Sequence, residues 1–167
     1  MGSKKISGSK FRSSGLNWNS EVAGLTYKSR ILDYDLARVL LVDDDPTSRL
    51  TLQTVLKAGG YHVDSAASAA EAVGKLDAGE YELVLSDLAM ESPDSGLKVI
   101  SHARMKDYKP ATALLTTYQN ARPAPAKHQN FLLIKPEDIP ELLSKVAYLI
   151  SDRATRRMER ELRLAAS

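Results

Sequence analysis

The stretch VLLVDDDPTSR (residues 39–49) places three consecutive aspartates directly after a run of aliphatic residues. An uninterrupted apolar run of this length is typical of a strand that is buried on both faces, as in a parallel sheet. Pro46 and the spaced leucines after it predict a helix that follows at once. Neighbouring carboxylates repel one another, so the three acids at the strand end indicate a ligand that holds them together.

The alternation of strands and helices continues along the chain. The pattern predicts strands at 38–42, 61–66, 81–87, 111–117 and 130–134, and helices after Pro46, after Ser68, over 95–105 and from about residue 137 or 140 to about 164. Such alternation implies right-handed crossovers and a parallel sheet covered by helices on both faces. We therefore predict an α/β fold with a flavodoxin-like, doubly wound, five-stranded parallel sheet of order 2-1-3-4-5.

Composition restricts the class of protein. The 167 residues include no cysteine, which excludes disulfide bonds, thiolate metal sites and cysteine nucleophiles. No apolar run approaches the roughly 18 residues that cross a bilayer. The N-terminal residues are basic without an apolar core behind them, so they do not form a secretory signal. A cytoplasmic location is the resulting expectation.

Charge divides the chain into three parts, although the formal net charge is only +2. Residues 1–34 hold six Lys/Arg and two acidic residues. Residues 35–150 hold twelve Lys/Arg and sixteen acidic residues, and residues 151–167 hold five Lys/Arg and three acidic residues. We predict a partly flexible N-terminal extension, an acidic domain and a C-terminal helical extension with these boundaries. Basic ends are most often solvated tails, so neither nucleic acid nor a membrane is the expected partner.

Polar residues occupy the predicted carboxyl ends of four strands. Asp43 and Asp44 follow the first strand, Asp87 the third, Thr116 the fourth and Lys135 the fifth. In doubly wound sheets, ligands bind beyond these strand ends. Mg²⁺ prefers carboxylate oxygens, while a hydroxyl and an ammonium suit phosphoryl oxygens. The set indicates phosphoryl transfer, with one aspartate as the nucleophile that forms an acyl phosphate.

Four blocks, VLLVDDDPTSR, LVLSDLAM, LLTTY and LLIKP, resemble those of the receiver domain of two-component response regulators, in the family's order and near its spacing. The likeness covers about residues 37–150. It implies a signalling domain, not an enzyme with a separate substrate, which accepts a phosphoryl group from a sensor histidine kinase or phosphotransfer protein with Mg²⁺. Phosphorylation would then alter a contact with a downstream protein. About 17 residues follow the domain, too few for a DNA-binding output, so a stand-alone receiver is expected.

The resemblance also implies a role for each site residue. The implied metal ligands are the carboxylates of Asp43, Asp44 and Asp87 and the backbone carbonyl of Ala89; the implied phosphoryl-binding groups are Asp87 as acceptor, the Thr116 hydroxyl and Lys135. Asp45 matches a variable position and is left outside the site. The step from Lys135 to Pro136 resembles one whose peptide is usually cis in the family. A related phosphohydrolase would need a general acid at residue 89, where this chain has alanine.

Departures from the family pattern keep an alternative open. Pro123 and Pro125 would each break a helix interior at a cost of about 3 kcal/mol, so we expect helix four of the receiver fold, over 118–129, to be shortened or absent. Thr117 replaces the usual small residue beside the phosphorylation site. These features favour an atypical receiver that acts as a phosphorylation-independent binding or dimerisation module.

The C-terminal extension offers a second contact surface. Ala154, Met158 and Leu162 recur at four-residue steps beyond the predicted domain. Such an apolar stripe could pair with a partner helix and form a homodimer. A solvated helix with a frayed end is the alternative.

Overall fold

The computed structural model describes residues 37–116 and 133–167. In chain order, its elements are β1 (Arg38–Val42), α2 (Pro46–Ala58), β2 (His62–Ala66), α3 (Ala69–Ala78), β3 (Leu83–Asp87), α4 (Ser95–Met105), β4 (Ala111–Leu115), β5 (Leu133–Ile134) and α5 (Ile139–Ala165). The strands lie in the order β2-β1-β3-β4-β5, and all four pairings are parallel. The predicted fold class and strand order are therefore confirmed.

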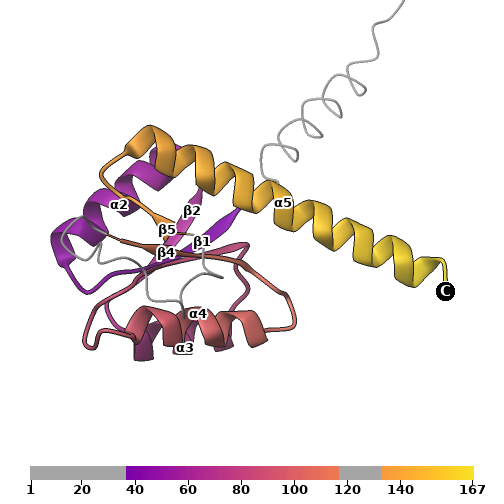
Figure 1. Ribbon diagram of the computed structural model, residues 1–167, viewed down its shortest axis with the longest axis horizontal. Helices are drawn as coiled ribbons and strands as arrows, with labels where there is room; N and C mark the ends of the chain where they lie inside the picture. The colour runs from indigo at the N-terminus through magenta and orange to yellow at the C-terminus, as the bar shows by residue number, and fades with distance from the viewer. Residues whose placement is uncertain (1–36, 117–132) are drawn as a thin grey trace, which may run out of the picture. The chain divides into compact units, whose positions relative to one another are not determined.

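Helices cover both faces of the sheet, α2 and α5 on one and α3 and α4 on the other (Figure 1). Side chains of a strand point alternately to the two faces, so β1 contributes to both cores. Val39 and Leu41 pack beneath α2 and α5, whereas Leu40 and Val42 pack against α3 and α4. All four side chains are fully buried, and burial of each contributes roughly 1.5–3 kcal/mol. The aliphatic run before the aspartates thus forms the centre of the molecule.

Local capping signals start the helices where the sequence predicts them. Asp45 caps α2, accepting a 2.6 Å hydrogen bond from the Ser48 N–H, and Pro46 occupies the first turn. Ser68 caps α3 and accepts from the Glu71 N–H, while the Glu71 carboxylate accepts from the N–H of Ala67. The first of these caps fixes the turn that carries the three aspartates.

Helix α5 is longer than the sheet that it covers (Figure 1). Its first half buries Leu142, Val146 and Leu149, and its second half continues without a break to Ala165. This agrees with the predicted end near residue 164, and the boundary proposed at residue 150 falls within the continuous helix. None of the helices in the described residues is long and apolar enough to cross a membrane.

Some sequence-based predictions fall outside the described residues. They concern the N-terminal extension, residues 1–34, and the segment 117–132, which includes the shortened or absent helix over 118–129 and Thr117. The described residues include Pro136, and the peptide before it is trans, because no peptide bond within the described ranges is cis. The cis peptide implied by the resemblance is therefore wrong here. An X-Pro bond favours trans by only about 0.5–1 kcal/mol, so the residue pair alone does not fix the isomer.

Candidate functional site

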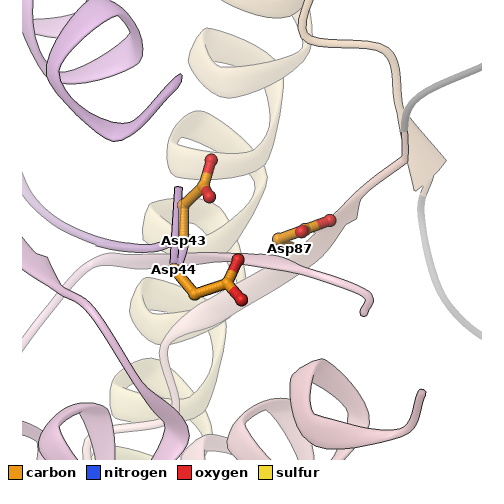
Figure 2. Close-up of side chains that lie close together, drawn as sticks. All are labelled: Asp43, Asp44 and Asp87. Carbon is orange, nitrogen blue, oxygen red and sulfur yellow. The ribbon is translucent and has the colours of Figure 1, made fainter. Parts of the chain in front are cut away.

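Three carboxylates meet at the carboxyl end of the sheet. Strands β1 and β3 are neighbours, with Val42 opposite Ser86, so Asp43 and Asp44 lie beside Asp87. One carboxylate oxygen from each aspartate lies within 4.8 Å of the other two (Figure 2). Asp43 is buried, Asp87 is half-buried and Asp44 is exposed. The cluster therefore has a closed side against the core and an open side toward solvent.

The electrostatics of the cluster are unfavourable without a counterion. Burial and the charge of Asp43, with a smaller contribution from Asp44, raise the pKa of Asp87 from an ordinary value of 3.8 to about 6. The backbone N–H groups of Leu88 and Ala89, close to the Asp87 carboxylate, oppose this rise in its pKa. Three close oxygen ligands with an open face fit a hard divalent cation such as Mg²⁺, which also offsets the repulsion.

Asp43 is held in place by the first turn of α2. The Ser48 hydroxyl donates to one carboxylate oxygen at 2.6 Å, and the Asp45 N–H donates to the other at 2.9 Å. The Arg49 guanidinium donates to the backbone carbonyl of Asp43 at 2.7 Å. The exposed Asp45 caps α2 through its carboxylate, which accepts from the Ser48 N–H, and it is not a member of the carboxylate cluster. Sequence reasoning missed Ser48 and Arg49, although both lie in the first turns of the helix that follows the acidic run.

Thr116 and Lys135 lie at the same edge of the sheet as the three carboxylates. Asp87 is opposite Leu115 in β4, which in turn is opposite Ile134 in β5. Thr116 and Lys135 each follow one residue later, so the parallel register places both at the carboxyl edge with Asp87. Thr116 is buried and Lys135 is exposed. Their contacts with a phosphoryl group stay predictions, as does the metal contact of the Ala89 carbonyl.

A small hollow of about 190 Å³ opens beside the carboxylates. Its lining residues come from the carboxyl ends of β1, β3 and β4, from the start and the second turn of α2, and from the segment after β5. They are Asp43, Asp45, Ser48, Leu52, Asp87, Leu115 and Pro136. Because one water occupies about 30 Å³ in the liquid, the hollow has room for a group larger than one water beside Asp87. Pro136 belongs to this lining, so the segment that begins at Lys135 borders the hollow.

Gly96 allows α4 to approach the end of β3 closely. A Cβ atom at this position would lie 2.0 Å from the backbone carbonyl oxygen of Asp87. The Gly96 N–H donates to the Leu88 carbonyl at 3.1 Å. Any larger residue would therefore displace the backbone that carries Asp87. A glycine at the start of a helix signals a close approach only weakly, and we did not predict this function for Gly96 from sequence.

The loop after β3 is fixed by side chains. The Ser95 hydroxyl accepts from the Ser92 N–H at 2.8 Å. The Glu91 carboxylate accepts from the Ala69 N–H, at the start of α3, at 2.9 Å. Glu91 thus connects the loop beside Asp87 to the neighbouring helix.

Asp87→Asn is expected to stabilise the metal-free protein at neutral pH. Folding raises the pKa of Asp87 from 3.8 to about 6, so the ionised carboxylate destabilises the folded state. This loss of stability is complete above about pH 6 and disappears as the pH falls through 3.8. We expect the free energy of unfolding to rise by about 1–2 kcal/mol near pH 7.5, after allowance for solvent screening, and by less near pH 4. Urea unfolding in EDTA at both pH values measures this; an equal change at both would contradict it.

Comparison with known proteins identifies the family. Residues 39–147 match the family model of the response regulator receiver domain. The transcriptional regulatory protein PcoR of Escherichia coli is 28% identical over 118 residues, covering 69% of this chain and 52% of PcoR; BasR of Escherichia coli K12 is 30% identical over 116 residues, covering 68% and 52%. The chain spans about half the length of these curated relatives.

Solved structures agree with this match. TrrA of Thermotoga maritima, in complex with Mg²⁺–BeF, is 29% identical with a TM-score of 0.54, covering 68% of this chain and 98% of that structure. CheY4 of Vibrio cholerae is 27% identical with a TM-score of 0.54, covering 66% and 98%. Together with the strand order and the acidic cluster, these similarities show that the chain belongs to the receiver domain family of two-component response regulators.

Proposed function

We propose that Asp87 accepts a phosphoryl group, in a Mg²⁺-dependent reaction, from a sensor histidine kinase or a phosphotransfer protein. The observation that supports this most strongly is the approach of three carboxylates within 4.8 Å at the carboxyl end of the sheet. A buried Asp43 beside an Asp87 whose pKa is raised to about 6 is a combination typical of functional sites.

The chain's own residues supply the nucleophile and its orientation. With a pKa of about 6, Asp87 is mostly ionised at neutral pH and can attack phosphorus. A bond forms between an Asp87 carboxylate oxygen and phosphorus, while the bond from phosphorus to the donor's imidazole nitrogen breaks. Asp43, Asp44 and the Ala89 carbonyl would hold Mg²⁺ with Asp87. When bound, the ion offsets the charge on the transferring group.

Thr116 and Lys135 would detect the phosphoryl group. A hydroxyl donor and an ammonium at the same edge of the sheet suit two of its oxygens. Movement of either residue toward the new charge would change the surface around β4 and β5, and so a protein–protein contact. In this role the chain catalyses only its own phosphorylation and dephosphorylation.

Mg²⁺ and beryllofluoride together are expected to raise the melting temperature by several degrees. A ligand at 100 times its dissociation constant stabilises the folded state by about 2.7 kcal/mol, which corresponds to a shift of this size. Asp87→Asn should lose the shift. Asp45→Asn is the matched control, because it also replaces an aspartate near the cluster by asparagine. Asparagine at this position still caps α2. Loss of the shift in Asp45→Asn but not in Asp87→Asn would contradict the proposal.

Self-association through α5 is a second, weaker proposal. Met158 and Leu162 are 60% and 63% exposed on the distal half of the helix. A double substitution of Met158→Asp and Leu162→Asp is expected to shift a dimer toward monomer in light scattering, because charge in an apolar helix seam is unfavourable. A wild-type protein that is monomeric at all concentrations would contradict it.

A further inference from the structure

A basic groove lies at the amino end of β4, away from Asp87. It has a volume of about 600 Å³, between the distal half of α5 on one side and the C-terminal end of α4 with the following loop on the other. Six cationic residues line it, namely Arg104, Lys109, Arg153, Arg156, Arg160 and Arg163, and Glu159 is the only acid in the lining. No residue of the groove belongs to the phosphorylation site.

Arg153 is a buried cation beside the groove. Arg153 is only 7% exposed. Its guanidinium donates to the Lys109 carbonyl at 3.0 Å and to the Tyr108 carbonyl at 2.8 Å. Both partners are neutral backbone groups, so these hydrogen bonds do not cancel the charge. Burial accordingly lowers the pKa of Arg153, and the charges of Glu82 and Glu80 oppose this shift. A positive potential therefore remains at the inner wall of the groove.

The loop opposite α5 has a strained backbone. Lys109 has a φ of +44°, and it is the one non-glycine residue with positive φ in the described parts of the chain. Its carbonyl accepts from Arg153, and its ammonium donates to the Arg104 carbonyl at 3.1 Å. Strained residues that persist are held by their surroundings and concentrate at binding sites. Here the strained residue connects the two walls of the groove.

The outer part of α5 presents a row of arginines toward this groove. Arg153, Arg156, Arg160 and Arg163 are three or four residues apart, so they share one side of the helix. Closer to the N-terminus of α5, the same side buries core leucines. Arg156 pairs with Asp152 at 2.8 Å, whereas Arg160 and Arg163 make no ion pair with any described residue. Unbalanced cations thus gather where the helix passes beyond the sheet.

We propose that this groove binds a small anion of nucleotide size that carries two or more phosphate groups. Arginine binds phosphate through two parallel hydrogen bonds, and the volume lies within the roughly 300–1,000 Å³ of ligand pockets. The cations converge from two walls on a bounded hollow, which suits a compact anion better than a long nucleic-acid backbone.

Titration calorimetry of the full chain with ATP and with inorganic triphosphate, in EDTA and about 150 mM salt, tests this proposal. We expect saturable one-to-one binding that weakens at least tenfold in Arg160→Glu and in Arg163→Glu. Arg157→Glu is the matched control, because it changes the charge of the same helix by the same amount. Arg157 lies outside the groove lining and pairs with Glu161. The control and Asp87→Asn should bind within twofold of wild type.

Three results would overturn the proposal. One is the absence of saturable binding by either phosphate compound. Another is an equal loss in Arg157→Glu, which would show attraction by net charge alone. The third is at least tenfold tighter binding of a single-stranded oligonucleotide or an acidic peptide, lost in Arg160→Glu, which would assign the groove to a macromolecule. The EDTA condition and the Asp87→Asn arm keep each result independent of the phosphorylation site.

Discussion

Asp87→Asn is expected to take up no phosphoryl group from acetyl phosphate, whereas the unchanged protein gains the mass of one. An amide is neutral and a far weaker nucleophile than a carboxylate, so the acyl phosphate cannot form at this position. Asp43 and Asp44 do not substitute for it, because Asp43 is held by Ser48 and Asp45 and Asp44 is exposed to solvent. Intact-protein mass spectrometry measures the gain directly.

Two further samples complete this experiment. Asp45→Asn should gain the same mass as the unchanged protein, because the Asp45 carboxylate caps α2 and lies outside the cluster. EDTA should abolish the gain, because the three carboxylates then repel the incoming phosphoryl group. A mass gain in Asp87→Asn would place the acceptor on another residue and contradict the proposed function.

Gly96→Ala is expected to destabilise the protein by about 3 kcal/mol or more, because overpacking at this position affects backbone atoms that cannot rotate away. The added Cβ would lie 2.0 Å from the Asp87 carbonyl oxygen and 2.9 Å from the Leu88 Cα. Relief requires α4 to move away from β3, which also shifts the Asp87 side chain. We therefore expect weaker Mg²⁺ binding together with the loss of stability.

Gly74→Ala provides the opposite control. Gly74 lies within α3, and a Cβ there would meet no atom within 4 Å. Alanine should raise the free energy of unfolding by about 0.5–1 kcal/mol, because it is the better helix former. Urea unfolding followed by circular dichroism compares the two variants. Equal stability of Gly96→Ala and wild type would contradict this prediction. It would show that the distance between α4 and β3 leaves room for a Cβ atom at residue 96.

The fold was predictable from sequence because each element carries its own local signal. The aliphatic run at 39–42 specifies a central strand, Pro46 and Ser68 mark helix starts, and the order of elements leaves few topologies. The positions of Asp43, Asp44 and Asp87 followed from one rule, that parallel strands end at a common edge.

Features that depend on contacts between distant residues were not predictable in the same way. Gly96 matters because of a backbone carbonyl nine residues earlier, and Ser48 because its hydroxyl reaches back to Asp43. The basic C-terminal residues, interpreted from sequence as a solvated tail, gain a specific arrangement only because Arg153 bonds to the loop at Tyr108 and Lys109. Spacing shows which residues share a helix face, and tertiary packing decides what lies opposite that face.

A crystal structure of the protein with Mg²⁺ and beryllofluoride tests the central claim most directly. We predict a metal ion bound by the carboxylates of Asp43, Asp44 and Asp87 and by the Ala89 carbonyl, with beryllofluoride on Asp87. The Thr116 hydroxyl and the Lys135 ammonium should each contact a fluorine atom. A structure in which either side chain points away from Asp87, or in which the metal binds elsewhere, would contradict the account.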